Sequence, residues 1–220
     1  MSASLEIILT KDGSHSLYNP DLDETYHSTK GALAESEYVF MEMGIQYLIT
    51  KQQPTRINVF EVGFGTGLNA FLCARKTSKE LSIHFHTVET VPLSSKIFKL
   101  FNYTSDMKGL FESLHQCEWE EEVVFEQFAL KKMETGLESV ELASNFYDVV
   151  FFDAFAPSKQ PDIWSEANLI KCYDALKAGG ILVTYCSQGQ FKRNLKSIGF
   201  NVEILPGALG KKEMVRAHKI

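Results

Sequence analysis

Residues 59–69 read Val59-Phe60-Glu61-Val62-Gly63-Phe64-Gly65-Thr66-Gly67-Leu68-Asn69. An apolar run ends in three alternating glycines, and a helical pattern begins directly after them. Glycine lets the backbone turn sharply and lets a ligand approach without a Cβ in the way. The dinucleotide pattern G-x-G-x-x-G would place its third glycine at position 68, which is Leu68, so the spacing departs from that of NAD-binding proteins. The segment predicts a strand, a cofactor-binding turn and a helix.

Short apolar runs alternate with amphipathic stretches from residue 55 onward. The predicted strands are 57–62, 83–89, 123–128, 147–153, 181–185, 200–205 and 213–217, and the predicted helices are 68–76, 93–101, 167–176 and 191–198. This βαβ alternation is typical of a mostly parallel sheet with helices on both faces. No helix separates the last two strands, so they should pair antiparallel. Residues 55–220 therefore resemble a seven-stranded, Rossmann-like α/β core of the class I methyltransferase type.

Residues 1–54 are predicted to form a small extension packed on this core. Two short apolar runs flank Asp12-Gly13, a pair that favours a tight hairpin turn. A buried helical stripe follows over residues 34–49, and Pro54 ends it. We expect one compact domain overall.

Composition excludes several classes of protein. No apolar run approaches the ~20 residues of a membrane span, and no leader pattern opens the chain, so we expect a cytoplasmic protein. Four scattered cysteines predict neither a disulfide framework nor a zinc site, and His84 and His86 lack a third ligand nearby, so we expect no metal. The net charge is −6, yet residues 191–220 carry +5, which permits a local surface for a polyanion.

Two further acids end predicted strands. Glu89 lies 28 residues after Glu61, where a carboxylate can accept both hydroxyl protons of a ribose. Asp153 ends the central fourth strand, beside the switch point where such sheets bind ligands, and its burial predicts a polar partner. The segment 128–131 after the third strand offers no acid for an adenine amino group, so either backbone groups contact the adenine or the third strand is placed wrongly.

Several long blocks of sequence carry a resemblance to a known family. They are Asp12-Gly13-Ser14, Asp23-Glu24-Thr25-Tyr26-His27-Ser28, Gly31-Ala32-Leu33-Ala34-Glu35-Ser36, residues 61–69, residues 153–164, Thr184-Tyr185 and Gly210-Lys211-Lys212-Glu213-Met214. Together they resemble the MnmC-type tRNA methyltransferase family nearly end to end. The resemblance implies S-adenosylmethionine as cofactor and conversion of 5-aminomethyl-2-thiouridine to 5-methylaminomethyl-2-thiouridine at the wobble position of tRNA. Some members carry an FAD-dependent oxidase on the same chain. This sequence resembles the stand-alone form, whose precursor is made by separate enzymes.

Candidate site residues follow from these patterns. The expected cofactor contacts are Glu61, Gly63, Phe64, Gly65, Gly67, Asn69, Glu89 and Asp153. Methyl transfer to an amine develops positive charge on nitrogen, which a carboxylate stabilises, so Asp153 is also the catalytic candidate. The expected contacts with the tRNA anticodon loop are Tyr26, Phe155, Trp164 and Tyr185 for stacking on the base, and Lys192, Arg193, Lys211 and Lys212 for phosphates. Residues 26–28 are expected to form a flap over the cofactor.

Three alternatives remain open. A methyltransferase or aminopropyl transferase for a small amine would use the same scaffold, as would a non-catalytic module that binds S-adenosylmethionine or RNA. An NAD oxidoreductase is disfavoured by the glycine spacing.

Overall fold

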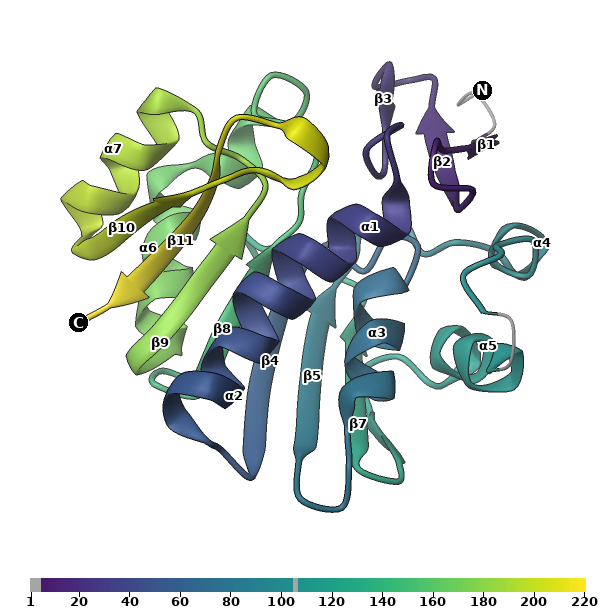
Figure 1. Cartoon of the computed structure of the whole chain (residues 1–220), viewed down its shortest axis with the longest axis horizontal. Helices are drawn as coiled ribbons and strands as arrows, with labels where there is room; N and C mark the ends of the chain where they lie inside the picture. Colours follow the sequence, from purple (N-terminus) through teal and green to yellow (C-terminus); the bar gives the residue numbers. More distant parts are fainter. Residues whose placement is uncertain (1–4, 105–106) are drawn as a thin grey trace.

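The computed structural model describes residues 5–104 and 107–220. An eight-stranded sheet forms its centre, in the order β10-β11-β9-β8-β4-β5-β7-β6 (Figure 1). The strands are β4 (Arg56–Val62), β5 (Ser82–Val88), β6 (Glu122–Phe125), β7 (Phe128–Met133), β8 (Tyr147–Phe152), β9 (Leu176–Thr184), β10 (Phe200–Leu205) and β11 (Met214–Lys219). The five strands from β9 to β7 run parallel, whereas β6, β10 and β11 are antiparallel to their neighbours.

Helices cover both faces of this sheet. They are α3 (Leu68–Lys76), α4 (Ser95–Phe98), α5 (Lys108–Gln116), α6 (Glu166–Ala175) and α7 (Gly189–Ile198), with short 3₁₀ turns η2 (Pro161–Trp164) and η3 (Ala208–Gly210). Successive residues of a strand point to opposite faces. Phe151 accordingly packs in the cluster under α3, and Phe152 in the cluster under α6 and α7. This two-sided burial explains the continuous apolar runs in the sequence.

One continuous helix crosses the face that α3 also covers. It comprises α1 (Ala32–Ser36), the π-helical segment η1 (Glu37–Gln46) and α2 (Tyr47–Gln52). Gly44 brings the helix close to the sheet, because a Cβ there would lie 3.1 Å from the Phe151 ring. The predicted helix 34–49 is confirmed and extends slightly beyond both expected ends.

The N-terminal strands form a separate small sheet of β1 (Glu6–Leu9), β2 (His15–Asn19) and β3 (Glu24–Thr25). The predicted hairpin is therefore present. Its turn caps the long helix, since Ser14 Oγ accepts the backbone N–H groups of Ala32 and Leu33 at 3.1 Å each, and Asp12 Oδ2 accepts that of Ala34 at 3.0 Å. These bonds satisfy donors that a helix start leaves free.

The α/β fold and the antiparallel C-terminal hairpin are confirmed, but the prediction of seven strands with a third strand at 123–128 is wrong. That segment spans β6, a tight turn and the first residue of β7, with Glu126 at φ +53° in the turn. The third parallel strand is β7. Its Lys132 side chain is fully buried and donates to the carbonyl of His115 at 2.6 Å. The sequence pattern did not predict β7 because a lysine interrupts the apolar run that marks a buried strand.

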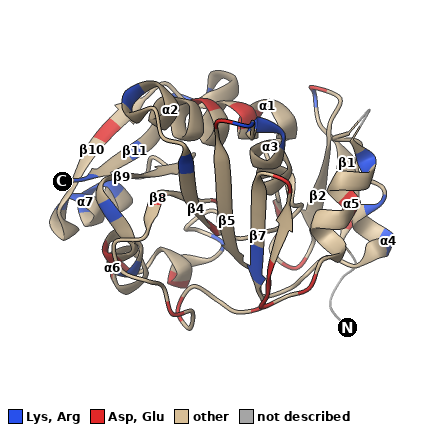
Figure 2. Ribbon diagram, turned by 90° about the horizontal axis from the view of Figure 1, so that it is seen from below, with Lys and Arg blue, Asp and Glu red and all other residues tan. Residues whose placement is uncertain are grey.

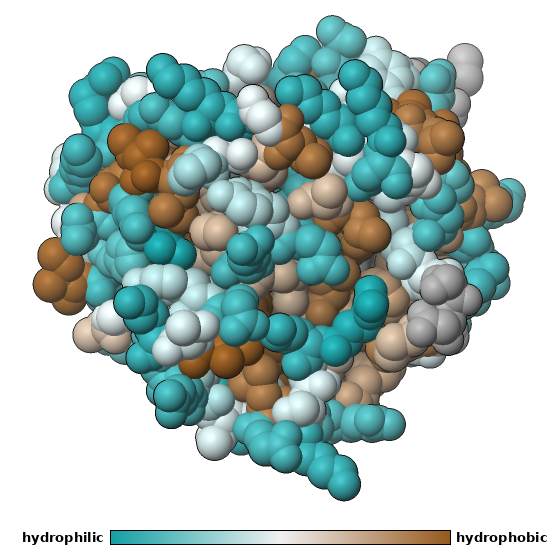
Figure 3. Space-filling view, in the orientation of Figure 1, coloured by the Kyte–Doolittle hydropathy of each residue, from teal (hydrophilic) through white to brown (hydrophobic). Residues whose placement is uncertain are grey.

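Charged and hydrophobic residues are both distributed over the fold. Lysine, arginine and acidic residues are interspersed along the ribbon (Figure 2), and hydrophobic side chains form separate small groups on the face in Figure 3. Over residues 5–104 and 107–220, no helix is long and apolar enough to cross a membrane.

Candidate active site

The glycine turn between β4 and α3 is built for close approach. Gly63 and Gly67 adopt φ of +93° and +71°, which side chains disfavour. A Cβ at Gly63 would lie 3.1 Å from the backbone oxygen of Asp153, and one at Gly67 would lie 2.7 Å from His115 Nε2. The backbone N–H groups of Gly63 and Phe64 both donate to the carbonyl of Val88, so the turn is held against β5. The turn therefore presents bare backbone at the carboxyl ends of the strands.

A first pocket of about 560 Å³ of empty space lies over this turn. Its walls include Tyr26, Gly63, Gly65, Glu89, Thr135 and Phe155. Thr135 follows β7, the third parallel strand, which was predicted too early in the sequence. The residues after this strand therefore do line the first pocket.

Glu89 organises the floor of the first pocket. One carboxylate oxygen accepts the N–H of Gly65 at 2.9 Å, and the other accepts those of Thr90 and Val91 at 2.9 Å each. Burial raises the pKa of Glu89, although these backbone hydrogen bonds oppose the increase. A carboxylate has about four acceptor positions, so capacity for a ligand hydroxyl remains.

Behind the pocket, two carboxylates share one amide. Asn69 Nδ2 donates to Glu61 Oε1 at 3.0 Å and to Asp153 Oδ2 at 2.8 Å, while Thr87 donates to the other oxygen of Glu61 at 2.8 Å. Burial and then the Asp153 carboxylate hold the pKa of Glu61 well above its usual range. Burial raises the pKa of Asp153 to about 7, Glu35 adds to the increase, and the bond from Asn69 and the charge of Lys211 oppose it.

Asp153 is thus the member of this group that reaches the pocket. Glu61 is 1% exposed, is absent from the pocket wall and holds Asn69; its expected contact with the cofactor stays a prediction. Phe64 is also outside the wall, because its ring packs edge-on against His115 and Trp119.

A second pocket, with about 580 Å³ of empty space, opens on the other side of Asp153. It shares Tyr26, Asp153, Ala154 and Phe155 with the first pocket. Its other walls include Glu35, Tyr185 and Lys211. The Tyr26 and Phe155 rings meet edge to face with centroids 4.9 Å apart. Two pockets therefore adjoin at one carboxylate and one aromatic pair.

The flap, residues 26–28, is locked to the glycine turn. His27 Nε2 lies 2.7 Å from Thr66 Oγ1, and His115 Nε2 donates to the Thr66 carbonyl from inside at 3.0 Å. Burial lowers the pKa of both histidines to about 4, so both are neutral at neutral pH. Neither histidine was singled out from the sequence, although His27 falls in a block that carried the family resemblance.

Residues 98–220, more than half of the chain, match a family described as S-adenosyl-L-methionine-dependent methyltransferase. The chain belongs to that family. This methyltransferase therefore uses S-adenosylmethionine as its methyl donor, as the sequence predicted.

Curated relatives and solved structures extend the comparison. The methyltransferase is 27% identical to the tRNA 5-methylaminomethyl-2-thiouridine biosynthesis bifunctional protein MnmC of Campylobacter hominis, covering 92% of this chain and 31% of that protein. It is 28% identical to the protein of the same name from Pseudoalteromonas translucida, with 89% and 33% covered. The chain spans about a third of the length of these relatives.

Among solved structures, MnmC2 from Aquifex aeolicus aligns with a TM-score of 0.82 and 26% identity over 98% of this chain and 70% of that one. A spermidine synthase from Thermotoga maritima aligns with a TM-score of 0.56 and 16% identity over 94% of this chain and 69% of that one. The second likeness shows the fold alone.

The first pocket of the methyltransferase fits S-adenosylmethionine chemically. The cofactor carries ribose hydroxyls and an ammonium group, and the pocket offers the remaining acceptor position of Glu89 and the Asp153 carboxylate. Asn69 Oδ1, behind the pocket, is buried and has no hydrogen-bond partner among the described residues.

The expected stacking role of Trp164 is wrong. Its indole is 6% exposed, packs on Phe152 and Phe191, and donates to the carbonyl of Phe155 at 2.8 Å. The indole therefore belongs to the core and fixes the backbone behind Phe155. Tyr185 does line the second pocket, and its hydroxyl donates to the carbonyl of Ala154 at 2.8 Å.

Of the four residues expected to bind phosphates, one lines the second pocket and three lie outside it. Lys211 lines the second pocket, whereas Lys192 lies outside it and pairs with Glu213 at 2.7 Å. Arg193 is exposed beside Gln190, and Lys212 is exposed. Among the described side chains, no group of three His, Cys, Asp or Glu could hold a metal ion.

Proposed function

We propose that this methyltransferase N-methylates the aminomethyl group of 5-aminomethyl-2-thiouridine at the wobble position of tRNA, giving 5-methylaminomethyl-2-thiouridine. The observation that carries the proposal is the meeting of two pockets at Asp153, one over the glycine turn and Glu89 and the other lined by Tyr185 and Lys211. The names of the MnmC relatives, which cover about nine-tenths of this chain, support the same reaction.

The cofactor, when bound, supplies a methyl group made electrophilic by a sulfonium. Glu89 accepts hydrogen bonds from the ribose, and the backbone at Gly63 and Gly65 lies against the amino-acid tail. Asn69 keeps the Asp153 carboxylate aimed at the junction of the pockets. Glu61 acts one step behind, because it holds the other side of the same amide.

Asp153 performs the proton chemistry at the acceptor. An amine must lose a proton before it can attack, and charge returns to the nitrogen as the new bond forms. With a pKa of about 7, Asp153 can take up a proton and can also stabilise the charged product. Tyr26 and Phe155 close the junction against water, which favours alignment of donor and acceptor.

The acceptor base enters the second pocket from a single-stranded loop. Tyr26, Phe155 and Tyr185 offer rings for stacking on a pyrimidine, and Lys211 offers a donor for its edge. Lys192, Arg193 and Lys212 lie outside this pocket and are assigned to the phosphates of the anticodon loop. The enzyme acts in the cytoplasm, where tRNA is modified. The aminomethyl precursor is supplied by a different catalytic activity, because methyl transfer consumes an amine that it does not produce.

The test is nucleoside analysis of tRNA taken from a strain that lacks this methyltransferase. Purified protein with isotopically labelled S-adenosylmethionine should convert accumulated 5-aminomethyl-2-thiouridine into its labelled N-methyl product. Labelling of small amines but not of tRNA would move the assignment to a small-molecule methyltransferase. Cofactor binding without transfer to any acceptor would identify a binding module.

A further inference from the structure

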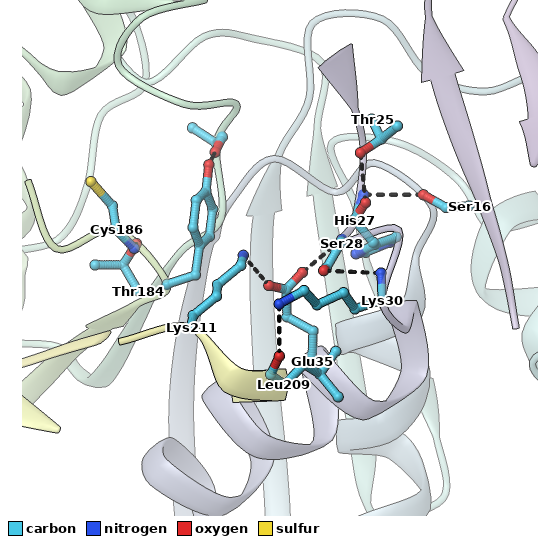
Figure 4. A network of polar contacts seen from close by, with 12 residues as sticks. Ser16, Thr25, His27, Ser28, Lys30, Glu35, Thr184, Cys186, Leu209 and Lys211 are labelled. Atoms are coloured by element: carbon cyan, nitrogen blue, oxygen red, sulfur yellow. Dashed lines mark hydrogen bonds and ion pairs between the residues drawn. The ribbon is translucent and has the colours of Figure 1, made fainter. Parts of the chain in front are cut away.

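An ion pair between Glu35 and Lys211 forms part of the wall of the second pocket (Figure 4). Lys211 Nζ lies 2.5 Å from Glu35 Oε1, and the Glu35 side chain is only 8% exposed. The other oxygen of Glu35 accepts the backbone N–H of Ser28 in the flap at 2.8 Å. The pair therefore joins α1, the flap and the loop before β11 around one space.

Neighbouring contacts hold both partners in place. Asp12 and Ser14 cap the start of α1, one turn before Glu35. Lys30 Nζ donates to the carbonyl of Leu209 at 3.1 Å, which ties the loop of Lys211 to the segment before the helix (Figure 4). A buried ion pair often contributes little to stability compared with apolar packing. Its presence on a pocket wall points to a role in the chemistry.

The electrostatic surroundings of Asp153 contain this pair. The titratable and charged groups around Asp153 and the second pocket are Glu61 of β4, Glu89 after β5, Glu24 of β3, Tyr26 and His27 of the flap, Tyr185 after β9, Glu35 and Lys211. Apart from burial, the charges that act on the pKa of Asp153 are Glu35, which raises it, and Lys211, which lowers it. The two partners therefore act on Asp153 in opposite directions.

We propose that Glu35 and Lys211 are positioning residues for methyl transfer: by compensating each other's charge on the pocket wall that they share with Asp153, they prevent Asp153 and the acceptor amine from holding their protons more tightly. This inference rests on the proposed function. A primary amine in water holds its proton with a pKa of roughly 10, as lysine does. Glu35 without Lys211 would stabilise that ammonium and remove the nucleophile, and would also favour protonation of Asp153. The paired cation prevents both effects.

The proton and electron balance is simple. The incoming alkylammonium gives one proton to Asp153 or to water and becomes a neutral amine. The nitrogen lone pair then forms the bond to the methyl carbon, and the electrons of the broken carbon–sulfur bond stay on sulfur. The product is a secondary ammonium, whose charge Asp153 faces.

The test compares pH–rate profiles of single-turnover methyl transfer for wild type, Lys211→Met, Glu35→Gln and the double variant. Lys211→Met should move the profile to higher pH by roughly one unit, and Glu35→Gln should move it to lower pH. The double variant should return close to wild type, and Lys211→Arg should keep the wild-type profile. Lys177→Met serves as the control, because Lys177 forms an ion pair with Asp148 at 2.7 Å near the starts of β9 and β8, and neither residue lines the first or the second pocket.

A second readout does not depend on the acceptor. Carbon NMR titration of the Asp153 carboxyl group in the ligand-free protein should show the same opposite shifts. The inference would be overturned if both single variants shifted the titration of Asp153 in the same direction. It would also be overturned if methyl transfer became slower while the pH–rate profile and the titration of Asp153 stayed unchanged, which would leave the ion pair a structural role only. If wild type methylates no tRNA while the titration shifts as expected, the proposed acceptor has failed and the electrostatic role of the pair stands. Thermal unfolding shows whether each variant is folded.

Discussion

Asn69 Nδ2 lies 2.8 Å from Asp153 Oδ2, and this amide is the only side chain described as donating to that carboxylate. The same nitrogen carries a second N–H group, which donates to Glu61 at 3.0 Å, so one amide joins two buried acids. Burial is the main cause of the raised pKa of both acids; the Asp153 carboxylate adds to the increase for Glu61, and Glu35 adds to it for Asp153. The ligand-free pair therefore retains protons at pH values where isolated carboxylates would have lost them.

Cofactor affinity should consequently increase with pH. S-adenosylmethionine is cationic, so it binds more tightly to the ionised pair, and the pKa of Asp153 of about 7 places the change between roughly pH 6 and 8. Calorimetry in buffers of different ionisation enthalpy should detect proton release on binding. Asp153→Asn should lose most of this dependence, and an unchanged pH dependence in that variant would contradict the assignment.

Asp153→Asn should also slow methyl transfer by more than ~10-fold while keeping the fold. The sign for stability is opposite to that for activity. The folded state raises the pKa of Asp153, so its contribution to stability is present at low pH and is lost as pH rises toward about 7. At pH 8 the asparagine variant should therefore unfold at a temperature no lower than wild type. A clearly lower Tm together with lost activity would indicate a structural defect.

Glu89→Ala should weaken cofactor binding by roughly 10- to 100-fold, because it removes a charged acceptor from both the ribose and the N–H of Gly65. Fluorescence or calorimetric titration with S-adenosylmethionine measures the change. Glu112→Ala is the matched control, since Glu112 is a partly exposed residue of α5 whose ion pair is with Lys108. Equal affinity of the two variants would exclude Glu89 as a cofactor contact.

Ser14→Ala should destabilise the protein by about 1–2 kcal/mol, because it removes the acceptor for two N–H groups at the start of the long helix. Urea unfolding monitored by circular dichroism gives this value. Ser197→Ala should change stability by less than ~0.5 kcal/mol, because its hydroxyl bonds only to a nearby carbonyl on exposed α7. If Ser14→Ala and Ser197→Ala reduced the free energy of unfolding by similar amounts, the helix cap at Ser14 would make no specific contribution to stability.

Arg193→Ala and Lys212→Ala should each weaken tRNA binding and reduce the slope of log affinity against log salt by about 0.7 for every phosphate that the side chain neutralises. Filter binding at several salt concentrations measures the slope. Lys51→Ala, an exposed residue of α2, should leave both quantities unchanged. A slope unaltered by all three changes would place the RNA on another surface.

The parts of the site that the sequence predicted are those encoded locally. The glycine turn, Glu89 and Asp153 each follow directly from a strand end, so one segment sufficed to place them. The position of the third strand and the burial of Trp164 were mispredicted because both depend on tertiary contacts. Lys132 is accommodated inside β7 by its hydrogen bond to the His115 carbonyl, and the Trp164 indole is held in the core by its hydrogen bond to the Phe155 carbonyl. Glu35 was missed because its partner is 176 residues away.

The order in which the two pockets acquire their walls along the chain has a consequence for synthesis. The lining residues of the first pocket end at Ile163, whereas the second also needs Tyr185 and Lys211. During synthesis, every residue that lines the first pocket has therefore been added about fifty residues before Lys211 completes the wall of the second pocket.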